Sequence, residues 1–291
     1  MELTSAGAVR EIQKRFSFTF KKGLGQNFLT SEDILERIAD AANANGDADN
    51  PTGNTVIIEV GPGFGALTQR LAQRADKVVS IEIDERLIDV LNYTLSDLDN
   101  VKIIRGDILK IDLAELIKTE FEGMTVSLAA NLPYYITTPI IARLLEEKLP
   151  LKSITVMVQK EVADRISAKP ASKDYGALSV LCQYFAKPEI IAKVPSSLFV
   201  PPPKVDSAVV RLEMLPEPSV KPSDEKVFFK TVRAAFSQRR KTLLNCLCSF
   251  FNMPKDEIRK IGDAAGIDLS RRGETLSLEE FAKLASALSI K

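Results

Sequence analysis

The chain alternates short β-branched and apolar runs with helical stretches, and this repeat constrains its fold more than any other feature. Five runs, at 56–60, 77–83, 101–105, 125–130 and 153–159, are each followed by a helical stretch. Repeated β-α units form a parallel sheet with helices on both faces. The sequence therefore predicts an α/β fold with a Rossmann-like sheet.

The segments on either side of this repeat do not share its β-α alternation. Residues 1–50 are mainly helical by pattern, with a loop at 21–29 and a helix from 31 to 44 that begins at the N-cap residue Ser31. The turn-forming stretch 45–54 predicts a surface loop. Further elements are expected at 177–186 (helix), 189–194 and 207–213 (strands), and 224–237, 240–251, 254–264 and 277–288 (helices). A proline-rich linker near residue 216 predicts two domains, a Rossmann-like domain at 1–215 and a smaller helical domain at 216–291.

Composition excludes several classes of protein. No run approaches the roughly 18 consecutive apolar residues of a membrane span, and no signal peptide opens the sequence. Three cysteines without a metal-binding spacing predict neither a disulfide framework nor a metal site, and we expect a cytoplasmic protein. Histidine is absent, which excludes Ser-His-Asp and Cys-His catalysis and predicts that activity shows no titration step near pH 6 to 7.

The first strand-to-helix turn has the sequence E-V-G-P-G-F-G, with glycines at 61, 63 and 65. Such glycines allow a ligand to approach the backbone closely. The spacing differs from the G-x-G-x-x-G of dinucleotide-binding folds, and no G-K-[ST] phosphate loop follows. The turn alone is a weak signal, because glycine-rich turns also serve ordinary packing.

Polar residues end the next strands of the predicted sheet. Glu82 lies about 20 residues beyond the glycine turn, where a carboxylate can reach ribose hydroxyls, and Asp107 and Asn131 end the following units. Ligands of open α/β sheets bind along this edge. A nucleoside site without phosphate-binding features favours S-adenosylmethionine over NAD.

The stretch N-L-P-Y-Y-I-T at 131–137 follows a buried strand and places an amide, a proline and two rings together. The stretch resembles the N-[LIP]-P-[YF] motif of amino-methyltransferases that act on adenine. By that resemblance, Asn131 and the backbone carbonyl of Leu132 would accept the two N–H bonds of the adenine amine. Pro133 shapes the turn, and Tyr134 offers a face on which a flipped-out base can stack. Such chemistry needs positioning more than a strong base.

Together with these motifs, three further segments make the resemblance specific: K-K-G-L-G-Q-N-F-L at 21–29, F-V-P-P-P-K-V-D-S-A-V at 199–209 and A-F-S-Q-R-R-K-T-L-L-N at 235–245. From Lys21 onward the chain resembles the ribosomal RNA adenine N6,N6-dimethyltransferase family, particularly its bacterial small-subunit members. The resemblance implies dimethylation of two adjacent adenosines in the 3'-terminal hairpin loop of 16S rRNA, in the immature 30S subunit. It implies a monomeric methyltransferase.

The resemblance also assigns residues. Cofactor contacts are expected from Gln26, Asn27, Leu29, Gly61, Gly63, Glu82, Ile83, Asp107, Ile108 and Asn131. The catalytic group is expected to comprise Asn131, Leu132, Pro133, Tyr134 and Phe199, with Phe199 as the second ring around the target adenine. By pattern alone, Phe199 is more typical of a core. RNA contacts are expected from Lys21, Lys22, Arg239, Arg240 and Lys241, since basic side chains neutralise phosphates.

Three alternatives remain open at this point. A large-subunit methyltransferase of the macrolide-resistance type shares the cofactor motifs, although Leu132 and the segment at 201–209 favour the small-subunit type. A ribosome-assembly or transcription factor could keep the fold without catalysis. A DNA adenine methyltransferase would show D-P-P-Y or N-P-P-Y where this chain has N-L-P-Y.

Overall fold

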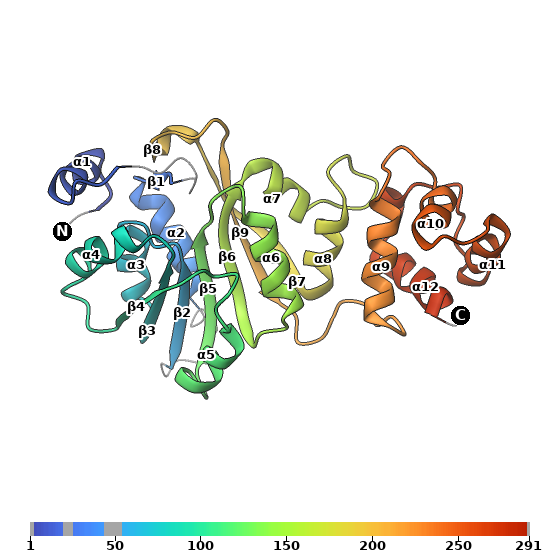
Figure 1. The fold of residues 1–291 in the computed structure, drawn as a ribbon, viewed down its shortest axis with the longest axis horizontal. Helices are drawn as coiled ribbons and strands as arrows, with labels where there is room; N and C mark the ends of the chain where they lie inside the picture. The colour runs from blue at the N-terminus through green and yellow to red at the C-terminus, as the bar shows by residue number, and fades with distance from the viewer. Residues whose placement is uncertain (1–2, 20–25, 44–53, 290–291) are drawn as a thin grey trace. The chain divides into compact units, whose positions relative to one another are not determined.

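The computed structural model describes residues 3–19, 26–43 and 54–289, and it divides into two compact units (Figure 1). The first unit comprises residues 1–163 and 188–214, and the second comprises 164–187 and 215–291. Residues 164–187 thus group with the C-terminal helices. The predicted functional domains at 1–215 and 216–291 stay a prediction.

The first unit is built on a seven-stranded sheet in the order β4-β3-β2-β5-β6-β9-β7. The strands β2 to β6 are parallel, and β9 pairs antiparallel with β6. Their bounds are β2 Thr55–Val60, β3 Lys77–Glu82, β4 Val101–Arg105, β5 Thr125–Asn131, β6 Leu151–Gln159, β7 Ala186–Val194 and β9 Ser207–Met214. The predicted α/β fold is confirmed, and the strand order changes direction between β2 and β5.

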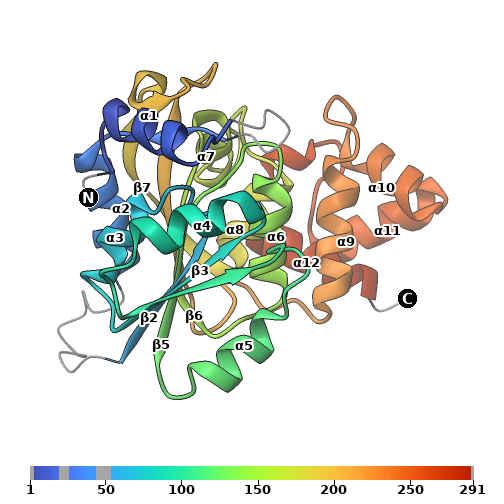
Figure 2. The same ribbon diagram turned by 60° about the vertical axis from the view of Figure 1, so that its left-hand side comes forward.

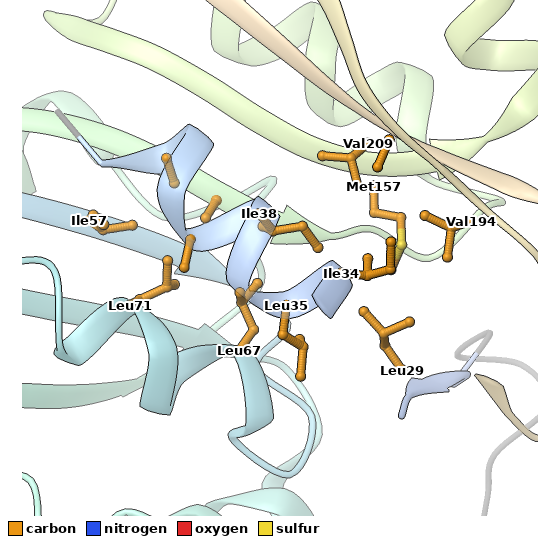
Figure 3. Packing of buried hydrophobic residues seen from close by; sticks show 14 of the residues in the cluster. Leu29, Ile34, Leu35, Ile38, Ile57, Leu67, Leu71, Met157, Val194 and Val209 are labelled. Carbon is orange, nitrogen blue, oxygen red and sulfur yellow. The ribbon is translucent and has the colours of Figure 1, made fainter. Parts of the chain in front are cut away.

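Helices cover both faces of this sheet. They are α2 (Glu32–Ala42), α3 (Ala66–Ala72), α4 (Glu85–Thr94), α5 (Leu113–Glu120) and α6 (Thr137–Glu146), while α7 (Lys160–Ile166) follows β6 and has residues in both units. Figures 1 and 2 show α2 and α3 on the face opposite α5 and α6. The α2 residues Leu35 and Ile38 pack with Leu71 of α3 and Ile57 of β2 in a dry cluster (Figure 3). Burial of such side chains contributes about 1.5–3 kcal/mol each, and this holds α2 and α3 against the strands.

An N-terminal helix and a small second sheet complete this unit. The helix α1 spans Ala6–Arg15, and its residues Val9 and Ile12 pack in a cluster with Phe64 of the glycine turn. Strand β1 (Phe28–Leu29) pairs antiparallel with β8 (Phe199–Val200). The prediction of a loop through residue 29 was therefore wrong at its end, because β1 is formed only with a partner far along the chain. Residues 21–25 of that loop and residues 45–53 of the other predicted loop lie outside the described residues.

The second unit is helical. Its helices are α8 (Ala177–Phe185), α9 (Glu225–Phe236), α10 (Leu243–Phe251), α11 (Lys255–Ala265) and α12 (Leu278–Ser289). Tyr184 and Phe228 lie with ring centroids 4.9 Å apart in its core, where Phe281 is also buried. Across the described residues, no helix is long and apolar enough to cross a membrane.

Candidate active site

A pocket opens in the first unit where β2, β3, β4 and β5 end. Its empty volume is about 1310 Å³, including the part open to solvent. It is lined by every predicted cofactor and catalytic residue except Phe199, namely Gln26, Asn27, Leu29, Gly61, Gly63, Glu82, Ile83, Asp107, Ile108, Asn131, Leu132, Pro133 and Tyr134. Segments that are distant in the sequence therefore meet at one edge of the sheet, as the parallel topology requires.

The glycine turn between β2 and α3 supplies one wall. Gly61, Gly63 and Gly65 have φ values of 71°, 60° and 92°, in the left-handed region that favours glycine. A Cβ at Gly63 would lie 2.9 Å from the ring of Phe28. A Cβ at Gly61 would meet no atom within 4 Å, so the backbone there borders open space that a ligand can occupy.

Glu82 ends β3 and is 5% exposed. Its Oε1 accepts a hydrogen bond of 2.8 Å from the backbone N–H of Asp84. Burial raises the pKa of Glu82 to about 7, more than this hydrogen bond lowers it. A buried carboxyl group at the strand end is suited to bind hydroxyl groups of a ligand.

Glu59 of β2 is a pocket-lining residue that the motifs did not reveal. Its Oε2 accepts hydrogen bonds from Thr68 Oγ1 at 2.6 Å and Ser80 Oγ at 2.8 Å, while Oε1 has no partner among the described residues. Burial raises the pKa of Glu59 to about 7. An acidic residue within an otherwise apolar strand, directly before the glycine turn, was the available signal.

Two carboxyl groups of the folded chain titrate near neutrality. Burial raises the pKa of both Glu59 and Glu82 to about 7. The reason is tertiary, because both carboxyl groups lose water when the sheet and helices enclose them. The expectation that activity shows no titration step near pH 6 to 7, which rests on the absence of histidine, stays a prediction.

Asn131 lies at the end of β5, with its amide oriented by a neighbouring segment. Its Nδ2 donates to the backbone carbonyl of Asn27 at 3.3 Å, and Oδ1 remains as the acceptor that this side chain can offer to a ligand in the pocket. The following turn is fixed because the Pro133 carbonyl accepts from the Ile136 N–H and from Thr137 Oγ1, each at 3.1 Å. The amide and the turn are therefore held in place before any ligand binds.

The two tyrosines of this turn differ in their surroundings. Tyr134 is half-buried, and its hydroxyl group forms a hydrogen bond of 2.7 Å with Ser207 Oγ. Desolvation raises the pKa of Tyr134 above its ordinary value, so the phenol stays neutral. Tyr135 also lines the pocket, yet it is 60% exposed.

Phe199, the expected second ring around the target adenine, lies in the core of the first unit. Its side chain is 2% exposed, packs in the cluster that contains Leu29 and Ile34, and is absent from the pocket lining. Pairing of β8 with β1 places Phe199 opposite Leu29 and draws its ring into the core. Its expected role as a second ring around the target adenine stays a prediction.

Two other predicted contacts have partners within the protein. Gln26 Nε2 donates to Asp84 Oδ2 at 3.0 Å, which ties the 26–29 segment to the end of β3. Asp107 Oδ1 accepts from the Leu109 N–H at 3.0 Å, and Lys110 Nζ lies 3.7 Å from its Oδ2. Both side chains still line the pocket.

The predicted RNA contacts lie elsewhere. Arg239, Arg240 and Lys241 form an exposed turn between α9 and α10 in the second unit. The guanidinium group of Arg239 donates to the Lys173 carbonyl at 2.7 Å. Lys21 and Lys22 lie outside the described residues.

The residues of the pocket fit S-adenosylmethionine. The space at Gly61 admits a ligand close to the backbone, and Glu82 offers a carboxyl group for hydroxyls. The exposed side chain of Ile83 gives an apolar surface beside it, and the partnerless oxygen of Glu59 gives an acceptor among the described residues. These carboxyl groups and this apolar surface are complementary to a ligand that combines a nucleoside with a cationic group.

Comparison with known proteins gives a consistent result. The family model described as ribosomal RNA adenine dimethylase matches residues 17–284. The chain is 51% identical to ribosomal RNA small subunit methyltransferase A of Geobacillus thermodenitrificans, over 99% of this chain and 97% of that protein. It is 50% identical to the protein of the same name from Clostridioides difficile, over 99% and 98%.

Solved structures agree in fold. A dimethyladenosine transferase from Plasmodium falciparum has a TM-score of 0.69 and 28% identity, over 88% of this chain and 95% of that one. The 23S rRNA methyltransferase ErmE has a TM-score of 0.67 and 27% identity, over 90% and 99%. The chain belongs to the ribosomal RNA adenine dimethylase family, and it is a methyltransferase that uses S-adenosylmethionine.

Proposed function

We propose that the protein dimethylates N6 of two adjacent adenosines in the 3'-terminal hairpin loop of 16S rRNA, acting on the immature 30S subunit. The observation that carries the proposal is the amide of Asn131, which lines the pocket with the glycine turn and is fixed by the bond from its Nδ2 to Asn27. The relatives named for the small ribosomal subunit support the choice of RNA.

The pocket residues act by positioning. Bound S-adenosylmethionine supplies a methyl group attached to a positively charged sulfur. Asn131 Oδ1 and the Leu132 carbonyl accept the two N–H bonds of the adenine amine, which favours the pyramidal amine whose lone pair can attack. Tyr134, with its hydroxyl group held by Ser207, stacks on the base. Neither acceptor needs to take the proton, because the nitrogen becomes acidic only after it gains the methyl group.

The remaining cofactor contacts are assigned to other residues that line the pocket at this edge of the sheet. Glu82 would hold the ribose hydroxyls of the cofactor, Asp107 would accept from its adenine amine, and Asn27 and Leu29 would close over its methionine part. Ile83 and Ile108 would offer apolar contacts to the cofactor. All of these residues line the pocket, which supports the assignment.

The helical domain, residues 216–291, recognises RNA in this proposal. Arg240 and Lys241 are exposed on the turn between α9 and α10, where they can neutralise phosphates. Arg239, Lys21 and Lys22 complete the proposed basic set. The protein acts as a monomer in the cytoplasm.

The test is incubation of the purified protein with methyl-labelled S-adenosylmethionine and immature 30S subunits, followed by mapping of modified nucleosides. We expect label as N6,N6-dimethyladenosine at two adjacent positions near the 3' end of 16S rRNA. Mature, fully methylated subunits serve as the control and should accept no label. Label in 23S rRNA, or none in any RNA, would contradict the proposal.

A further inference from the structure

Tyr135 is the exposed ring of the catalytic turn, and neither the fold nor the proposed chemistry uses it. Its side chain is 60% exposed although it lines the pocket. The turn around it is already fixed through the Pro133 carbonyl, which accepts from Ile136 and Thr137. Removal of the Tyr135 ring therefore leaves the hydrogen bonds of the turn intact.

Its neighbour Tyr134 shows the contrast. The hydroxyl group of Tyr134 is bound to Ser207, which fixes that ring at the wall of the pocket. For Tyr135 the structure shows no side-chain hydrogen bond, ion pair or ring contact among the described residues. A large aromatic face thus stands in solvent one residue from the ring assigned to the target base.

An exposed aromatic ring at this place can bind an RNA base that has lost its stacking partner. A target adenine reaches Asn131 only after it leaves the stack of its strand, and its neighbours in the strand then lose a stacking partner. Unpaired RNA bases are commonly held on exposed aromatic side chains. Since Tyr135 borders the same pocket, it lies where the strand enters or leaves.

We propose that Tyr135 is a stacking platform for the nucleotide adjacent to the target adenine, and so a positioning residue for the RNA strand. The proposal rests on the proposed function, because it requires an RNA adenine in the pocket. The core position of Phe199 is consistent with it, since that ring is not at the pocket surface in this structure. The platform binds one unpaired base and reads no particular sequence.

The experiment compares wild type with Tyr135→Ala, Tyr135→Phe and the control Ile190→Ala. Ile190 is also an exposed apolar residue of the first unit, but it does not line the pocket. Particles are reassembled from ribosomal RNA that carries 2-aminopurine, or an abasic site, on either side of the target adenine. Binding, single-turnover methylation and 2-aminopurine fluorescence are measured for each protein.

We expect Tyr135→Ala to weaken RNA binding roughly 5- to 150-fold, the usual range for loss of one base stack. The single-turnover rate at saturating particle concentration should fall far less than the affinity. Tyr135→Phe should keep the affinity, because stacking needs the ring and not the hydroxyl group. Wild type should quench 2-aminopurine on one side of the target, and the Ala variant should not. With the abasic RNA, wild type and Tyr135→Ala should bind equally.

Unchanged RNA affinity in Tyr135→Ala would overturn the proposal, as would an equal loss of affinity on the abasic RNA. A loss in Tyr135→Phe as large as in Tyr135→Ala would assign the effect to the hydroxyl group and also overturn it. The proposed function fails separately, because in that case wild type itself would methylate no adenosine of the particle.

Discussion

The pocket of the first unit and the basic turn of the second unit use polar groups in opposite ways. Glu59 and Glu82 are nearly without solvent, and each has a pKa raised by burial. The side chains of Arg240 and Lys241 are exposed to solvent. Interactions of desolvated groups are strong and specific, whereas solvent and salt screen exposed charges. One substitution in the pocket should therefore change rate, stability or affinity more than one substitution in the basic turn.

The largest effect tests whether the pocket acts by positioning. Asn131→Ala removes the acceptor Oδ1 and should lower the single-turnover rate roughly 10²–10³-fold, the usual range for one preorganised electrostatic contact. RNA binding should change only a few-fold, since Tyr134 keeps its bond to Ser207. Rapid-quench methylation assays measure the rate. A near-normal single-turnover rate in this variant would show that the Asn131 side chain does not position the adenine amine.

The second effect concerns stability and pH. Glu59 has a folded pKa of about 7, against an ordinary value of 4.5 for a glutamate in water. Between these values the folded chain keeps the proton that the unfolded chain has released, so the free energy of unfolding falls as pH rises from about 4.5 to 7. The contribution of Glu59 to that fall is about 3 kcal/mol. Glu82 adds a fall of the same sign.

Glu59→Gln removes this titration and keeps an oxygen for Thr68 and Ser80. We expect the fall in unfolding free energy over that window to shrink by about half, because Glu82 still titrates. Urea unfolding from pH 4.5 to 8 measures it, with Glu115→Gln on exposed α5 as the control. An undiminished fall in the Glu59 variant would show that this carboxyl group is not the source.

The third effect concerns the cofactor. At pH 8, above the Glu82 pKa of about 7, Glu82→Ala removes a charged acceptor for the ribose hydroxyls. Such an acceptor is worth roughly 1.5–3 kcal/mol, so the Kd should rise about 10- to 150-fold. Titration calorimetry with S-adenosylmethionine measures the affinity. Asp89→Ala, on the exposed face of α4, is the control and should bind normally. An unaltered Kd in Glu82→Ala would place the ribose elsewhere.

The smallest effect per residue belongs to the basic turn. Replacing Arg240 and Lys241 together by Ala should weaken binding to all RNAs alike and reduce the slope of log K against log salt by about 1 for each phosphate that is no longer neutralised. Replacing Arg259 and Lys260 of α11 removes the same charge from another exposed surface. Equal losses of affinity in the two double variants would mean that only net charge matters, and not the turn.

Local pattern determined most of the elements of this protein. The strands from β2 to β6 and the helices α9 to α12 were predicted within a few residues. Their apolar periodicities depend only on consecutive residues of the sequence. The glycine turn, Glu82, Asp107 and Asn131 were found in the same way. Each ends a strand of a parallel sheet, and the topology alone requires that such ends share one edge.

Tertiary structure alone decided the rest. The partner of Phe28–Leu29 is a strand near residue 200, and that pairing moved Phe199 into the core. The amide of Asn131 is oriented by Asn27, which lies 104 residues earlier. The pKa values of Glu59 and Glu82 depend on how much water the packed helices leave around them. Burial, pairing and orientation arise between segments distant along the chain, so no local pattern contains them.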